Sequence, residues 1–149
     1  MKTYESPLPE ITLKYKSGEQ KKAKISNSSD AAEIMKKLFD QDTLELTESF
    51  IVLYLNKQNN TIGWIKISQG GINGTVVDIR LIFATALKCA ASCIIMAHNH
   101  PSGNLKPSCE DKNMTDRVKE AAKIFDISIL DHLIFSADTH YSMSDEGLI

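Results

Sequence analysis

Cysteine is scarce in this sequence, and the few cysteines present form no recognisable pattern. Cys89, Cys93 and Cys109 are odd in number, and none belongs to a Cys-x-x-Cys pair. Such a set argues against a disulfide framework and against a zinc site built from thiolates. We therefore expect three free thiols, two facing the core and one near the start of a helix.

Long apolar runs and an excess of one charge are also missing. The longest apolar stretch, residues 50–55, is far shorter than the roughly 20 residues that span a bilayer, and the N-terminus lacks the apolar core of a signal peptide. The net charge is −2, whereas a dominant nucleic-acid-binding surface normally brings a basic excess. We expect a cytoplasmic globular protein that contacts no membrane.

The distribution of apolar residues predicts one domain preceded by a short extension. Residues 10–17 and 20–26 alternate apolar and polar side chains, which favours a hairpin within an extension of residues 1–25. Residues 26–149 are predicted to form the domain, with strands at 48–55, 61–68, 92–97, 127–135 and 139–143 and helices at 31–40, 75–91 and 108–125. This mixture of hairpins and one βαβ-like passage predicts an α/β sandwich with a mixed sheet.

The residues that indicate chemistry gather between His98 and Asp111. A predicted buried strand leads into His98-Asn-His100, and side chains two apart on an extended backbone point to the same side. Pro101 favours extended geometry at the residue before it. We therefore expect the two imidazoles to converge on one metal ion.

Asp111 is the expected third ligand, because it lies in the first turn of the helix predicted to begin near Ser108. Two imidazoles and one carboxylate leave a tetrahedral position open, which is typical of a catalytic zinc site. Ser108-x-x-Asp111 is also a capping-box pattern, and a carboxylate that closes a cap has less freedom to bind metal. We expect Asp111 to bind the metal and Ser108 either to cap the helix or to donate to an oxyanion.

A zinc hydrolase also needs a group that accepts a proton from water and passes it to the leaving group. Glu48 is the expected proton carrier, because it opens a strand that is otherwise apolar on both faces. Glu45 is the nearest alternative. His132, in an apolar strand, is expected to be a core histidine rather than a ligand, with Asp131 as its hydrogen-bond partner or as support for the site. Trp64 is expected in the core.

Taken together, these residues resemble a known family. His98-x-His100, seven residues and then Ser108-x-x-Asp111, with Glu48 upstream, resembles the JAMM signature of JAB/MPN metalloproteases.

The longer stretch over residues 98–115, together with residues 131–134, resembles the RadC branch of that family, and the resemblance runs from about residue 25 to the end of the chain. It implies a cytidine-deaminase-like, three-layer α/β/α sandwich, one Zn²⁺ and peptidase or isopeptidase chemistry. By the same resemblance Glu48 would be the general acid/base and Ser108 the oxyanion donor, while the metal ligands would be His98, His100 and Asp111.

Two functions of different class follow. The first is a zinc-dependent hydrolase of amide bonds, acting on a peptide or protein substrate. The second is a non-enzymatic, zinc-stabilised binding module associated with DNA repair or DNA, which the charge balance does not favour. A deaminase is disfavoured, because the Pro-Cys-x-x-Cys ligand pair is missing.

Overall fold

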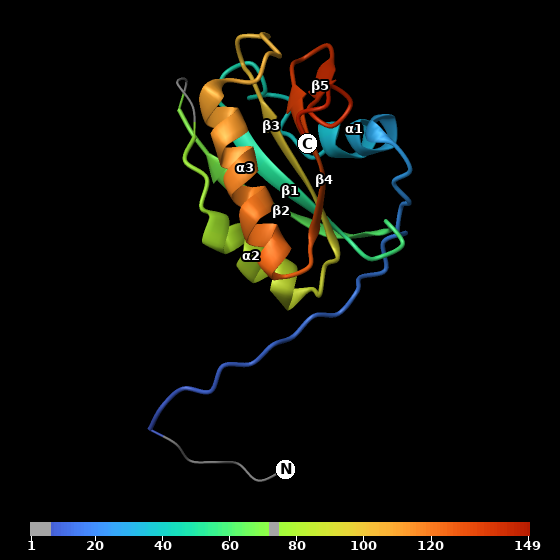
Figure 1. The fold of residues 1–149 in the computed structure, drawn as a ribbon, viewed down its shortest axis with the longest axis vertical. Helices are drawn as coiled ribbons and strands as arrows, with labels where there is room; N and C mark the ends of the chain where they lie inside the picture. The colour runs from blue at the N-terminus through green and yellow to red at the C-terminus, as the bar shows by residue number, and fades with distance from the viewer. Residues whose placement is uncertain (1–6, 72–74) are drawn as a thin grey trace.

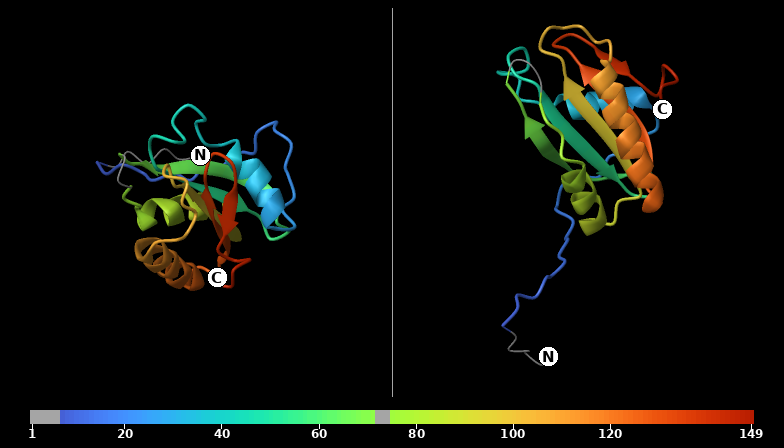
Figure 2. Two further views of the ribbon diagram at one scale, coloured as in Figure 1. Left: turned by 90° about the horizontal axis from the view of Figure 1, so that it is seen from above. Right: turned by 60° about the vertical axis from the view of Figure 1, so that its left-hand side comes forward.

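A mixed β-sheet forms the middle layer of the computed structural model, which describes residues 7–71 and 75–149 (Figure 1). The five strands lie in the order β2-β1-β3-β4-β5. Their bounds are Ser49–Leu55 (β1), Thr61–Gln69 (β2), Cys93–Asn99 (β3), Ser128–Phe135 (β4) and His140–Ser142 (β5). Helix α1 (Ser28–Lys36) covers one face, and α2 (Ile79–Lys88) and α3 (Cys109–Ile124) cover the other (Figure 2). The predicted α/β architecture with a mixed sheet in three layers is confirmed.

The central strands explain where the polar residues meet. Every residue of β1 and β3 is buried, because both strands lie between the two helical layers and most of their side chains are apolar. The two strands are antiparallel, with Phe50 opposite His98. The start of β1 therefore lies beside the end of β3, and a residue just before β1 is a neighbour of the residues that end β3.

Two element boundaries differ from the sequence prediction in ways that affect the site. Helix α2 begins at Ile79 instead of residue 75, because the Asp78 side chain accepts a hydrogen bond from the Arg80 amide at 2.9 Å and caps the helix there. Residues 75–78 are therefore outside the helix, and Val76 is 89% exposed. Strand β3 continues to Asn99, so His98 lies within the strand and not in the loop after it.

The expected N-terminal hairpin is absent from the described residues. Residues 7–23 contain no strand, and Lys24 forms only an isolated bridge to Asn60. The segment runs away from the body of the protein with Ile11 and Leu13 exposed (Figure 1). A two-stranded hairpin without a surface to cover does not offset the entropy of ordering its backbone. Residues 1–6 of the predicted extension lie outside the described part.

Trp64 is also not in the core: it is 47% exposed, because it lies on β2, an edge strand. The cysteines match the expectation more closely. Cys93 is buried, Cys89 is half-buried, and Cys109 is exposed at the start of α3. Among the described residues, no helix combines the length and apolar character needed to cross a membrane.

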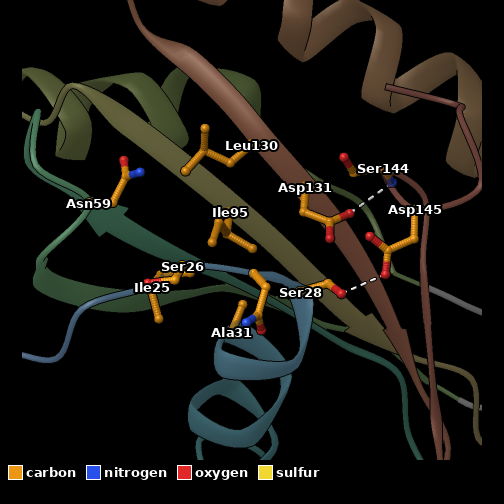
Figure 3. A pocket seen from close by; sticks show the side chains of 11 residues that line it. Ile25, Ser26, Ser28, Ala31, Asn59, Ile95, Leu130, Asp131, Ser144 and Asp145 are labelled. Atoms are coloured by element: carbon orange, nitrogen blue, oxygen red, sulfur yellow. Dashed lines mark hydrogen bonds between the residues drawn. The ribbon is translucent and has the colours of Figure 1, made fainter.

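Strand β4 places Asp131 on the α1 side of the sheet, where it borders a pocket of about 270 Å³ (Figure 3). Its carboxylate accepts hydrogen bonds from the Ser142 hydroxyl at 2.5 Å and from the Ser144 amide at 3.0 Å. It also accepts one from the backbone amide of His132, at 2.7 Å, and makes none with the His132 ring. Asp131 therefore holds the C-terminal segment against β4 by hydrogen bonds. It does not orient the ring of His132.

Candidate metal centre

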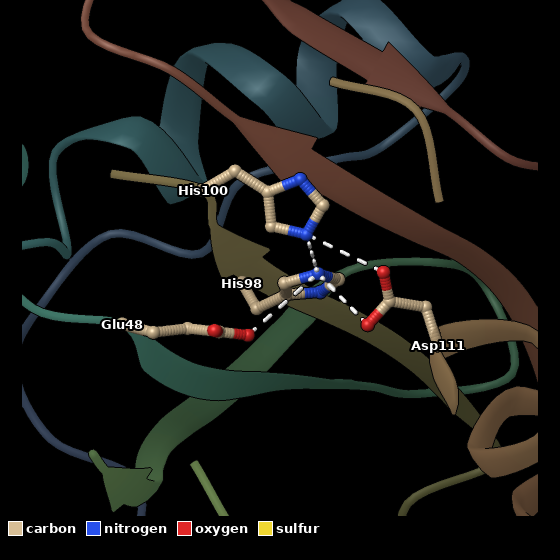
Figure 4. A group of neighbouring side chains, drawn as sticks. All are labelled: Glu48, His98, His100 and Asp111. Atoms are coloured by element: carbon tan, nitrogen blue, oxygen red, sulfur yellow. Dashed lines mark hydrogen bonds and ion pairs between the residues drawn. The ribbon is translucent and has the colours of Figure 1, made fainter. Parts of the chain in front are cut away.

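Four side chains from separate parts of the chain converge on one point (Figure 4). Glu48 precedes β1, His98 is the last residue but one of β3, His100 follows in the loop, and Asp111 lies in the first turn of α3. One potential ligand atom from each lies within 4.8 Å of all the others. Such a group can hold a metal ion.

The ligand atoms lie close enough together to hold one metal ion. The Nε2 atoms of His98 and His100 are 2.9 Å apart, and each lies 3.3 Å from an oxygen of Asp111. Zinc–nitrogen bonds of about 2.0–2.1 Å at tetrahedral angles separate two ligand atoms by about 3.3 Å. Two imidazoles and one carboxylate are also ligand types that zinc accepts. The donor types therefore suit zinc, which would bind with a position left for water or substrate.

Asp111 serves the helix cap and the cluster at the same time. Its Oδ2 accepts a hydrogen bond from the Ser108 amide at 2.8 Å, while the Ser108 hydroxyl accepts one from the Asp111 amide at 3.0 Å. Its Oδ1 lies toward His98. Capping and metal binding, which were expected to compete, are compatible here: Oδ2 accepts from the Ser108 amide and also lies 3.3 Å from Nε2 of His100. The capping box fixes the carboxylate in the direction of the histidines.

Glu48 and not Glu45 belongs to the cluster. The Oε1 atom of Glu48 is 4.0 Å from Nε2 of His98, whereas Glu45 is exposed and outside the group. The segment that carries Glu48 is fastened by Asn99, whose side-chain oxygen accepts from the Ser49 amide at 2.8 Å.

The Asn99 side-chain nitrogen donates to the carbonyl groups of Leu44 and Thr47 at 2.8 and 2.9 Å. Asn99 is 1% exposed, so these bonds are sheltered from water. Sequence reasoning missed this residue, although a polar side chain between two candidate ligands was a usable signal.

The two carboxylates of the site differ in their pKa shifts: the pKa of Asp111 is lowered and that of Glu48 is raised. Burial raises the pKa of Glu48, and the nearby imidazoles only partly oppose this. Burial acts in the same direction on Asp111, but hydrogen bonds from His100 and His98 outweigh it and hold the pKa of Asp111 far below its usual range. The hydrogen bond with Asp111 raises the pKa of His100. Asp111 is therefore an anion at neutral pH.

A second set of contacts lies behind the cluster, and the sequence analysis did not foresee it. The His132 ring is fully buried and lies 2.7 Å from Nδ1 of His98 and 2.7 Å from the hydroxyl of Thr115. Burial lowers the pKa of His132, so its imidazole is neutral. His132 is a core histidine, as expected, and it also contacts a candidate ligand.

The cluster opens into a cleft of about 460 Å³. Its apolar lining includes Phe50, Met114 and Val76, and its polar lining includes Ser108 and Arg117. The site can therefore admit a substrate group beside the four clustered side chains.

Comparison with known proteins identifies the family. Residues 25–148 match the family model of the RadC-like JAB domain, which accounts for most of the chain. The chain belongs to the RadC-like JAB domain family. The fold agrees, since an α/β domain with an open mixed sheet is consistent with a JAB domain.

Related proteins are found in bacteria and archaea. A "UPF0758 protein" of Flavobacterium johnsoniae is 46% identical over 126 residues, which are 84% of this chain and 53% of that protein. Proteins of the same name from Aquifex aeolicus and Methanosarcina mazei are both 37% identical, over 95% and 88% of this chain and 59% and 56% of their own lengths. The chain thus spans a little more than half the length of these relatives.

Proposed function

We propose that this RadC-like JAB domain is a zinc-dependent hydrolase of amide bonds, of the JAMM type, acting on a peptide or isopeptide. The observation that carries the proposal is the convergence of two imidazoles and two carboxylates at a cleft. A site that served only stability would be closed by its ligands, whereas these four side chains line a cleft that a substrate group can enter.

In this proposal His98, His100 and Asp111 hold the ion, and Glu48 moves the proton. When bound, zinc supplies a Lewis acid and lowers the pKa of water to about 7. The Oε1 atom of Glu48 is 4.0 Å from Nε2 of His98, whereas Oδ1 of Asp111 is 3.3 Å from the same atom. The longer distance suits a group that contacts the water and the substrate and does not bind the metal. Its raised pKa brings it nearer to the range in which a carboxylate both accepts and returns a proton.

The proton transfers balance the hydrolysis. Glu48 accepts a proton from the attacking water as the oxygen–carbon bond forms at the amide carbonyl. It then gives the proton to the amine nitrogen as the carbon–nitrogen bond breaks, so the products are a carboxylic acid and an amine. Ser108 lines the same cleft, and its hydroxyl uses only an acceptor site in the cap. Its proton is available to the oxyanion that develops on the attacked carbonyl.

A cleavage screen tests the proposal. The zinc-loaded wild type is incubated with a peptide library and with isopeptide-linked peptides, next to Glu48→Gln and the matched control Glu45→Gln. We expect cleavage by the wild type and by Glu45→Gln. Loss of the proton carrier in Glu48→Gln should lower the rate by about 10²–10⁴-fold while zinc stays bound.

Equal cleavage by Glu48→Gln and the wild type would contradict the role of Glu48. Zinc binding without any cleavage, together with salt-dependent DNA binding, would favour the non-enzymatic module instead.

A further inference from the structure

We propose that His132 and Thr115 form a relay of hydrogen bonds that holds His98 in the tautomer and orientation needed to bind the metal. The inference rests on the proposed zinc site and assigns positioning roles to two residues that do not touch the ion.

The relay is short and continuous. His98 Nδ1 lies 2.7 Å from His132 Nε2, and His132 Nδ1 lies 2.7 Å from the Thr115 hydroxyl. The Thr115 hydroxyl in turn donates to the Asp111 carbonyl at 2.7 Å. The relay thus connects the ring of one expected ligand, His98, to the backbone carbonyl of another, Asp111.

Apart from the Met143 sulfur, which lies 3.8 Å from the Thr115 hydroxyl, the described surroundings of the relay offer no substitute partner. His132 and Thr115 are 0% exposed and His98 is 1% exposed, so water does not replace a missing bond. The Phe50 ring lies parallel to His98, with centroids 6.1 Å apart, and meets His132 edge-on at 5.6 Å. Both imidazoles are therefore confined by packing, and each has one polar neighbour on the side away from the cluster.

The direction of every bond follows from one end of the relay. A histidine that binds metal through Nε2 carries its proton on Nδ1. The Nδ1–H of His98 then donates to His132, which must accept through a bare Nε2. A neutral imidazole with a bare Nε2 has its proton on Nδ1, which donates to the Thr115 hydroxyl.

Thr115 ends the relay. Its hydroxyl donates its proton to the Asp111 carbonyl, and its oxygen accepts a hydrogen bond from His132. If the Thr115 acceptor is removed, His132 is favoured with its proton on Nε2, where it faces His98. His98 would then accept through Nδ1 and carry its proton on Nε2, the atom that binds metal. Thr115, which lies on the far side of His132 from His98, should thus control the metal affinity.

Zinc affinity measured against a coloured chelator tests the relay without any substrate. The variants are His132→Leu, which removes the acceptor, and His132→Gln, whose amide oxygen replaces it. Thr115→Val and Thr115→Ser form the second matched pair. Loss of a group that supports a ligand costs about 10–100-fold in metal affinity. We expect that loss in His132→Leu and Thr115→Val, and a loss of less than about tenfold in His132→Gln and Thr115→Ser.

Two further readouts separate positioning from stability. Thermal unfolding of the zinc-free variants reports stability alone, and ¹H–¹⁵N spectra of the zinc-loaded wild type report the ring protons. We expect His132 to carry its proton on Nδ1 and not on Nε2. A proton on His132 Nε2, unchanged zinc affinity in His132→Leu, or equal losses within each matched pair would overturn the relay. A wild type that binds no zinc would overturn the proposed function and the relay together, whereas the other results leave the zinc site intact.

Discussion

Replacing Asp111 by asparagine should reduce the zinc-dependent part of the protein's stability while leaving its helix cap in place. The amide oxygen of Asn can still accept from the Ser108 amide, which Asp111 Oδ2 does now at 2.8 Å. The substitution removes the anion that lies 3.3 Å from Nε2 of both His98 and His100. The capping contribution, about 1 kcal/mol for such a cap, is therefore preserved.

The size of the effect follows from the ligand count. A direct ligand contributes at least as much as an outer partner, whose loss costs about 10–100-fold in affinity. At saturating zinc this equals about 1.4–2.7 kcal/mol of lost stabilisation. For a domain of this size 1 kcal/mol shifts the Tm by about 2–4 °C. The zinc-induced rise in Tm should therefore shrink by about 3–11 °C.

The assay is thermal unfolding with and without zinc, and the matched control is Asp116→Asn, an exposed carboxylate on the same helix. The control should keep the full zinc-induced rise. If Asp111→Asn shows the same rise as the wild type, Asp111 is not a ligand and the geometry of the cluster has been misinterpreted.

Three other outcomes are expected. The hydrogen bond with Asp111 raises the pKa of His100, so in metal-free protein the charged His100–Asp111 pair stabilises the fold. This stabilisation is fully present below the ordinary imidazole pKa of about 6.5, and it is lost as the pH rises through the raised pKa. The Tm difference between wild type and His100→Gln, in chelator, should therefore shrink toward alkaline pH; a constant difference would contradict this. Asn99→Leu leaves buried backbone groups unpaired, so urea unfolding should show a loss of about 1–3 kcal/mol and faster amide exchange at Ser49, unlike the exposed control Asn113→Leu. Deleting residues 1–19 should leave zinc content and Tm unchanged, because the described part of that segment is exposed; lost zinc would refute it.

The part of the site that sequence could predict is the part made by local structure. His98, His100 and Asp111 lie within one short stretch in which a strand, a loop and a capped helix follow one another. Strand alternation and cap chemistry fix the directions of these side chains without knowledge of the rest of the fold. Glu48 is distant in sequence, and only the register of β1 against β3 brings it to the histidines.

The contacts that sequence reasoning missed are all long-range. His132 meets His98 because β4 lies parallel to β3, an order that no local pattern specifies. Thr115 is one helical turn after Asp111, so its side of α3 was predictable, but its partner was not. The N-terminal alternation misled for the opposite reason: it suits a strand, yet residues 7–23 pair with no strand of the sheet.

Metal content is the most direct test of the central claim that these side chains form a zinc site. The measurement is elemental analysis of the untagged protein after exposure to zinc at neutral pH, for wild type, His98→Ala and Glu48→Gln. We expect close to one zinc per chain in wild type and in Glu48→Gln, and little in His98→Ala. A wild type without zinc, or a His98→Ala variant that binds it as well, would contradict the account.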